Sequence, residues 1–159
     1  MTVADLLNRA RDAGIRIATA ESCTGGMVAA ALTDIAGSSD VVERGVVTYS
    51  NAAKQDLLGV RAETLATYGA VSEQVAGEMA EGALARAPVQ LAVSVTGIAG
   101  PGGSDFKPEG RVCFGLAFKG HAPLVETVEF GAIGRAGVRQ AARDHALNLL
   151  MRGVLQIDQ

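Results

Sequence analysis

The stretch that decides the fold lies near the N-terminus, where the sequence reads IRIATAESCTGG over residues 15–26. Its first part, from Ile15 to Ala20, alternates apolar and polar residues and predicts a strand. The run from Gly26 to Ile35 is rich in Ala, Val and Leu and predicts a buried helix. A strand, a tight turn and a helix in succession indicate an α/β fold.

The rest of the chain continues this alternation of helices and strands. Further strands are predicted at 44–50, 89–95, 112–118 and 124–130, and further helices at 3–13, 51–58, 61–69, 73–87 and 135–152. Helices separate the first three strands, whereas the last two adjoin and form a hairpin. We therefore predict an α/β fold, a three-layer α/β/α sandwich with a mixed, mostly parallel central sheet. No repeat or linker divides the chain, so we expect a single domain over residues 1–159.

The composition excludes several classes of partner. The net charge is −3 and aromatic residues make up 4% of the chain without any Trp, which argues against a nucleic-acid partner. The two cysteines share no metal-ligand spacing and suggest no disulfide framework. No apolar stretch is long enough to span a membrane, and no basic segment precedes an apolar run at the start. We expect a cytoplasmic protein with no membrane partner.

Ser22 is the first residue with a chemical interpretation. At a turn from strand to helix its hydroxyl is exposed, and the unpaired N–H groups of the helix start point to the same place. A nucleophile beside anion-stabilising donors is what acyl transfer needs. The alternative is that Ser22 or Thr24 caps the helix and the glycines serve the turn. Cys23 is a second possible nucleophile, although a small buried neighbour is the expectation for it.

A serine nucleophile also needs a base, and Lys54 is the leading candidate. The two histidines, His121 and His145, are distant in sequence from the glycine-rich turns. Lys54 follows the second predicted strand as Ser22 follows the first, so both reach the carboxyl edge of the sheet if these strands are parallel neighbours. Desolvation there would lower the pKa of the lysine. The alternative is an exposed helix lysine.

The glycine-rich segment VTGIAGPGG, residues 95–103, follows the most apolar predicted strand and should reach the same edge. Glycine lets a backbone approach a ligand closely and direct N–H groups toward it. The segment lacks the spacing of a dinucleotide fingerprint and the ending of a P-loop, and a plain flexible loop is the alternative. Lys107, Arg135 and Arg139 offer cations for a phosphate, although each alone is typical of a solvated surface charge.

Four motifs, considered together, resemble the CinA C-terminal-domain family in order and spacing over nearly the whole chain. They are AESCTGG at 20–26, YSNAAK at 49–54, LGV at 58–60 and TGIAGPGG at 96–103. That family includes stand-alone nicotinamide-nucleotide amidohydrolases. The resemblance implies an α/β/α domain that hydrolyses the carboxamide of nicotinamide mononucleotide to nicotinate mononucleotide and ammonia. It implies a small pyridine mononucleotide as partner and no metal or organic cofactor.

The resemblance also implies roles for individual residues. Ser22 matches the nucleophile, and Lys54 with Tyr49 matches a proton-transfer pair. The substrate-binding positions it implies are Thr24, Gly25, Thr96, Gly97, Lys107, Arg135 and Arg139.

Two residues depart from the family pattern at the expected substrate-binding rim. Glu109 stands where a small apolar residue is usual, and Gly134 stands where an acidic one is usual. These departures leave open an amidohydrolase for another small amide, and a nucleotide-binding module without turnover is a further alternative. The apolar content and the Ala-rich helices lead us to expect a homo-oligomer.

Overall fold

The computed structural model describes residues 1–104 and 106–158, which fold around a five-stranded sheet. Asp105, inside the predicted glycine-rich loop, and Gln159 lie outside the described residues. The strands stand in the order β2-β1-β3-β4-β5. Their bounds are β1 (Ile17–Glu21), β2 (Val42–Val47), β3 (Leu91–Gly97), β4 (Arg111–Phe118) and β5 (Leu124–Glu129).

The sheet is mixed, as predicted. β1 pairs in parallel with β2 and β3, whereas β4 is antiparallel to both β3 and β5. Four of these strands therefore run in one direction and β4 runs against them. The pairings themselves divide equally between parallel and antiparallel. The predicted hairpin of the last two strands is confirmed.

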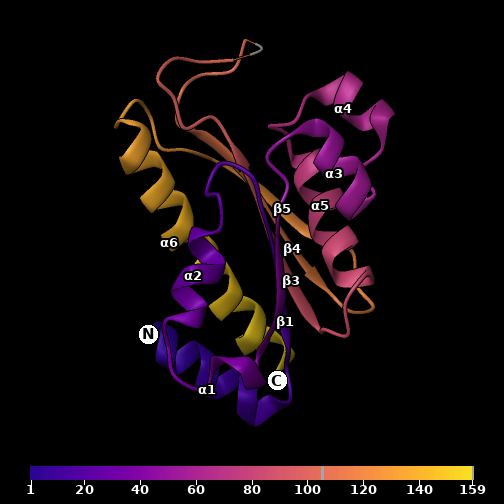
Figure 1. Cartoon of the computed structure of the whole chain (residues 1–159), viewed down its shortest axis with the longest axis vertical. Coiled ribbons are helices and arrows are strands. Elements are labelled where there is room, and N and C mark those ends of the chain that lie inside the picture. Colours follow the sequence, from indigo (N-terminus) through magenta and orange to yellow (C-terminus); the bar gives the residue numbers. More distant parts are fainter. Residues whose placement is uncertain (105, 159) are drawn as a thin grey trace.

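Helices cover both faces of the sheet, which confirms the three predicted layers (Figure 1). One face carries α1 (Val3–Ala13), α2 (Met27–Thr33) and α6 (Arg135–Ile157); the other carries α3 (Asn51–Leu58), α4 (Ala62–Tyr68) and α5 (Glu73–Ala85). A short 3-10 turn, η1 (Ser38–Asp40), leads into β2. Within the described residues, no helix combines the length and the apolar composition that crossing a lipid bilayer requires.

The two faces of the sheet differ in the size of their side chains. Because successive side chains of a strand point to opposite faces, β3 contributes Leu91, Val93 and Val95 to the core under α1, α2 and α6. The face under α3 and α5 is lined by small residues, namely Ala18, Ala20, Ala92 and Ala117. Small side chains allow these helices to approach the sheet closely.

Two glycines show how close this approach is. A Cβ on Gly115 of β4 would lie 2.4 Å from the carbonyl oxygen of Ala76 in α5, and one on Gly82 of α5 would lie 1.9 Å from that of Leu58 in α3. Real Cβ atoms do not tolerate such distances, so neither position accepts a side chain without movement. The sheet, α5 and α3 are thereby packed backbone against backbone.

The predicted element boundaries differ from the observed ones chiefly at two places. The strand predicted at 44–50 is observed at Val42–Val47, because the chain leaves the sheet early and Ser50 caps α3 by accepting a hydrogen bond from the N–H of Ala53. The last helix continues beyond the predicted residue 152 to Ile157, since Gly153 packs against Leu91 instead of ending the helix.

Candidate active site

Ser22 and Lys54 meet at the carboxyl edge of the sheet. β1 lies between its parallel neighbours β2 and β3. Both pairings continue past the end of β1: the N–H of Ser22 donates to the carbonyl of Val95 in β3, and the N–H of Thr48, just after β2, donates to the carbonyl of Glu21. Lys54 extends from α3 over this edge. Its Nζ donates to Ser22 Oγ at 3.0 Å and to the Thr48 carbonyl at 2.8 Å.

The surroundings of Lys54 favour its neutral form. Its side chain is 1% exposed, so the alternative of an exposed helix lysine is wrong. Burial lowers its pKa below the ordinary 10.5, and a smaller contribution from Cys23 acts in the opposite direction. Within residues 1–104 and 106–158, no carboxylate forms an ion pair with Lys54. A neutral lysine amine beside a serine hydroxyl can accept its proton.

Gly26 is the N-cap residue of α2, but the side chain that caps the helix is that of Glu21. Sequence reasoning missed this role. Neither Ser22 nor Thr24 caps the helix. The buried carboxylate of Glu21 accepts hydrogen bonds from the backbone N–H groups of Val28 at 2.9 Å and Ala29 at 3.0 Å. Thr24 is fully buried and donates its hydroxyl to the same carboxylate at 2.6 Å, so its side chain faces Glu21. An acidic residue just before a helix start is favoured by the helix dipole, and this signal could have found it.

Arg139 of α6 holds the turn from the other side. Its Nε donates to the carbonyl of Cys23 at 3.0 Å and its Nη2 to that of Thr24 at 3.4 Å. Gly25 has a φ of +59°, and a Cβ there would lie 3.2 Å from the Arg139 guanidinium. Both predicted substrate-binding residues, Gly25 and Arg139, therefore shape the turn in this structure.

Cys23 is buried in the core, which confirms it as a small packed neighbour of Ser22. Burial raises the pKa of its thiol to about 11. Because the thiolate is the reactive form, this environment disfavours Cys23 as a nucleophile.

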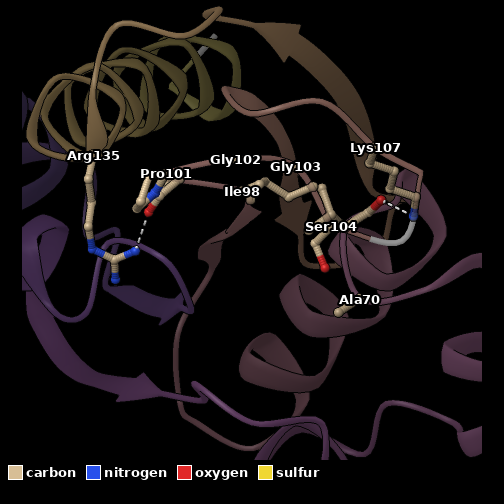
Figure 2. Close-up of a pocket in the computed structure, with 12 residues that line it drawn as sticks. Ala70, Ile98, Pro101, Gly102, Gly103, Ser104, Lys107 and Arg135 are labelled. Carbon is tan, nitrogen blue, oxygen red and sulfur yellow. Dashed lines mark hydrogen bonds between the residues drawn. The ribbon is translucent and has the colours of Figure 1, made fainter.

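The glycine-rich loop lines an open pocket of about 310 Å³. Figure 2 shows Arg135 at one side of this pocket and Ser104 with Lys107 at the other. The pocket does not reach Ser22 or Lys54 themselves. One of its lining residues is Gly97. Gly97 lies two positions after Val95, and the carbonyl of Val95 accepts the N–H of Ser22.

Thr96 and Lys107, both predicted to bind substrate, donate hydrogen bonds to backbone carbonyls at the end of α4 and in the segment between α4 and α5. Thr96 Oγ1 donates to the carbonyl of Ala70 at 2.8 Å. Lys107 Nζ donates to the carbonyls of Tyr68 at 2.6 Å and Val71 at 2.5 Å. These bonds tie β3 and the glycine-rich loop to that connection, and a role of Thr96 or Lys107 in substrate binding stays a prediction.

Arg135 joins the loop to Tyr49. Its Nη1 donates to the carbonyl of Gly100 at 2.8 Å and its Nη2 to the Tyr49 hydroxyl at 2.7 Å. Tyr49 is 60% exposed, and its hydroxyl contacts Arg135 instead of Ser22 or Lys54. The structure thus unites Ser22 with Lys54 but does not add Tyr49 to them, and its part in proton transfer stays a prediction.

The two departures from the family pattern have local structural reasons. Glu109 accepts a hydrogen bond from the N–H of Gly102 at 2.6 Å and so fastens the two limbs of the loop. Gly134 precedes α6 with φ +88° and ψ 153°, a conformation that side-chain-bearing residues rarely adopt.

The histidines and possible metal ligands lie apart from this site. His145 of α6 contacts Glu126 of β5, and His121 packs against Phe118. In the part of the chain that the structure describes, no group of three or more His, Cys, Asp or Glu side chains is arranged to hold a metal ion.

Comparison with known proteins identifies a family and several close relatives. A family model described as the CinA C-terminal domain matches residues 2–154. The nicotinamide-nucleotide amidohydrolase PncC of Escherichia coli K12 is 52% identical over 144 residues, which cover 90% of this chain and 87% of that protein. A CinA-like protein of Mycolicibacterium gilvum is 53% identical over 143 residues, covering 89% of this chain but only 34% of that protein. A CinA-like protein of Chlorobium phaeobacteroides is 60% identical over 115 residues, 72% of this chain and 27% of that protein.

Solved structures agree in fold over nearly the whole chain. A competence/damage-inducible protein of Agrobacterium tumefaciens superposes with a TM-score of 0.88 at 48% identity and covers 99% of this chain and 96% of that one. A CinA superfamily protein of Escherichia coli superposes with a TM-score of 0.90 at 37% identity, covering 94% of this chain and 87% of that one. The chain thus spans most of these structures and about a third or less of the CinA-like relatives above.

Proposed function

Because the chain belongs to the CinA C-terminal domain family, we propose that it hydrolyses the carboxamide of nicotinamide mononucleotide to nicotinate mononucleotide and ammonia. The observation that carries the chemistry is the 3.0 Å contact between the buried Lys54 amine and Ser22 Oγ. The substrate is suggested by the names of the relatives from Escherichia coli and Enterobacter agglomerans, which this chain matches over 83–87% of their lengths.

In the proposed reaction Ser22 Oγ attacks the carboxamide carbon while neutral Lys54 accepts the hydroxyl proton. The tetrahedral intermediate collapses when Lys54 returns this proton to the leaving amide nitrogen, which departs as ammonia and leaves an ester on Ser22. Water then attacks the ester, again giving a proton to Lys54, and release of the acid restores the serine. One base thus serves both halves of the reaction.

The oxyanion would be held by backbone N–H groups of the serine turn. Two of the N–H groups at the start of α2, those of Val28 and Ala29, are occupied by Glu21. Among the described residues of the turn, the N–H groups of Cys23, Thr24 and Gly26 donate to no oxygen acceptor. These donors are the ones we assign to the developing negative charge.

The rest of the nucleotide would occupy the pocket under the glycine-rich loop. A pocket of about 310 Å³ is at the small end of the range for ligand sites. Lys107 and Arg135 both line it, so it offers two cations although the chain as a whole carries a net charge of −3. We assign the phosphate to this pocket because Lys107 and Arg135 line it, whereas Arg139 does not.

Release of ammonia from nicotinamide mononucleotide tests the proposal. We expect turnover by the wild type and a loss of at least about 10³-fold in Ser22→Ala, because a residual rate comes only from binding and the oxyanion donors. A folded Ser22→Ala protein that keeps most of the deamidase rate would exclude the serine mechanism. No ammonia from the wild type, together with measurable binding of the nucleotide, would point to the non-catalytic module instead.

The identity of the substrate needs a separate test, because the carboxylate of Glu109 lies on the glycine-rich loop, to which we assign the nucleotide. Nicotinamide mononucleotide, nicotinamide riboside and nicotinamide differ by the phosphate and then the ribose. We expect kcat/KM to fall at each removal. Equal kcat/KM values for the first two would argue for a different small amide. A homo-oligomer and a cytoplasmic location stay predictions, and sedimentation of the purified chain tests the first.

A further inference from the structure

We propose that Glu21 is a positioning residue, whose buried carboxylate holds the serine turn so that Ser22 faces Lys54. The inference rests on the proposed function, since it assumes that Ser22 is the nucleophile. It adds to the reaction a residue that touches neither the substrate nor the Lys54 amine. Its evidence is the way in which Glu21 connects β1 to α2.

The carboxylate of Glu21 is fully engaged by the start of the helix. Oε1 accepts hydrogen bonds from Thr24 Oγ1 at 2.6 Å and from the N–H of Val28 at 2.9 Å, and Oε2 accepts one from the N–H of Ala29 at 3.0 Å. The side chain is 1% exposed, and no lysine or arginine pairs with it in the described part of the chain. Its negative charge is therefore met by the positive end of the helix, which such geometry stabilises.

Besides Glu21, the serine turn is held from outside by Arg139, which binds the carbonyls of Cys23 and Thr24 but none of its N–H groups. Gly25 and Gly26 adopt φ values of +59° and +108°, and Gly26 as N-cap offers no side chain to bond the helix. Glycine backbones are the most mobile when nothing holds them. Glu21 supplies the missing cap from within the adjoining strand, where its own carbonyl accepts the N–H of Thr48.

Ser22 lies directly between these two fixed points. On one side the backbone of Glu21 is held in the sheet, and on the other its side chain holds Thr24 and the first turn of α2. Loss of the carboxylate would release the turn while leaving Lys54 in place, because Lys54 is fixed by the Thr48 carbonyl. The distance between nucleophile and base would then vary, and small misplacements of reacting groups are costly in rate.

Glu21→Gln is the sharpest variant, because it keeps size and shape but places an amide NH₂ opposite a backbone or hydroxyl donor. We expect kcat for nicotinamide mononucleotide to fall about 10- to 100-fold with KM within about twofold. The matched control is Thr2→Ala, which removes the side-chain cap of α1, far from the site. It should lower thermal stability and leave kcat unchanged.

Each outcome separates this inference from the proposed function. A folded Glu21→Gln protein with wild-type kcat would overturn the positioning role, even if Ser22→Ala were inactive. Full activity of Ser22→Ala would instead remove the proposed function. If Glu21→Gln does not fold, Thr24→Val deletes only the 2.6 Å bond to the carboxylate. We expect this variant to fold with kcat reduced and KM maintained, and an unchanged kcat would count against the inference.

Discussion

Lys54 Nζ lies 3.0 Å from Ser22 Oγ, although 32 positions separate the two residues in the chain. The contact depends on the parallel pairing of β1 with β2, which brings both strand ends to one edge. It depends also on α3, which begins at the cap Ser50 and carries Lys54 back over that edge. The properties of the site follow from this single contact and its burial.

The first prediction concerns the pH dependence of turnover. Lys54 must be neutral to accept the serine proton, and burial lowers its pKa from 10.5. We therefore expect kcat/KM to rise with pH through this lowered pKa and to level off above it. Lys54→Arg should lower kcat/KM at least about 100-fold, because a guanidinium does not give up its proton and cannot act as the base. An acidic limb that persists unchanged in Lys54→Arg would assign the titration to another group.

The second prediction concerns stability. Because the pKa of Lys54 is lower in the folded than in the unfolded chain, the unfolded chain binds more protons between the lowered value and 10.5. The contribution of Lys54 to the free energy of unfolding must therefore rise with pH across this window. Lys54→Met lacks this contribution. We expect the stability of Lys54→Met relative to wild type to decrease as pH rises toward 10.5, as measured by urea unfolding, and a constant difference would contradict a lowered pKa.

The third prediction separates Cys23 from its neighbour. With a thiol pKa of about 11, only about one molecule in three thousand carries the thiolate at pH 7.5. Alkylation of Cys23 by iodoacetamide in the native protein should be slow and should accelerate with pH up to that value. Cys23→Ala should keep kcat within about threefold, since the thiol packs in the core. Loss of activity comparable to that of Ser22→Ala would show that the thiol takes part.

The fourth prediction decides the role of Tyr49. Its hydroxyl accepts a hydrogen bond from Arg135 on the rim of the pocket. Tyr49→Phe removes only this hydrogen bond, and we expect KM to rise about three- to tenfold with kcat little changed, which is the typical net contribution of one hydrogen bond. Arg135→Gln should raise KM further. A fall in kcat of about 100-fold in Tyr49→Phe, with KM maintained, would support a role in proton transfer instead.

The fifth prediction tests the close packing beneath Lys54. A Cβ on Gly82 would collide with the carbonyl of Leu58 at the end of α3. Gly82→Ala should therefore cost about 1–3 kcal/mol in the free energy of unfolding and lower kcat, because α3 carries Lys54. Gly77→Ala in the same helix is the control, since its Cβ would meet only side-chain atoms, with Val125 Cγ1 at 3.2 Å. It should be at least about 1 kcal/mol less destabilising than Gly82→Ala.

How much of this molecule was predictable from sequence is clearest at the strand ends. The strand predicted at 15–20 and the helix predicted at 51–58 were recognisable from local patterns. The expectation that Ser22 and Lys54 meet at one edge was conditional on parallel pairing of the first two strands, which the structure shows. Side-chain directions were not predictable in this way. Lys107 and Arg139 were predicted as cations for a phosphate, and nothing in the sequence indicated that each also donates to backbone carbonyls that only the tertiary fold brings near. Their part in substrate binding stays a prediction.

The role of Glu21 was also not predictable from local sequence preferences. Local preference favours Ser or Thr as a helix cap, and the sequence offers both in the turn. Glu21 caps the helix instead, because it lies at the end of β1 and its longer side chain reaches the N–H groups of Val28 and Ala29. Which of several nearby side chains caps a helix depends on tertiary geometry, and residue propensities do not describe that geometry.

Arg139 gives the serine turn a dependence on the far end of the chain. Its guanidinium, 116 positions beyond Cys23, completes the turn by bonding two of its carbonyls. A growing polypeptide can therefore form the sheet strand and the first helices long before its nucleophile acquires its final surroundings. On the proposed mechanism, turnover would therefore begin only after the last helix has docked, and proteolytic removal of this helix would abolish turnover without cleaving near Ser22.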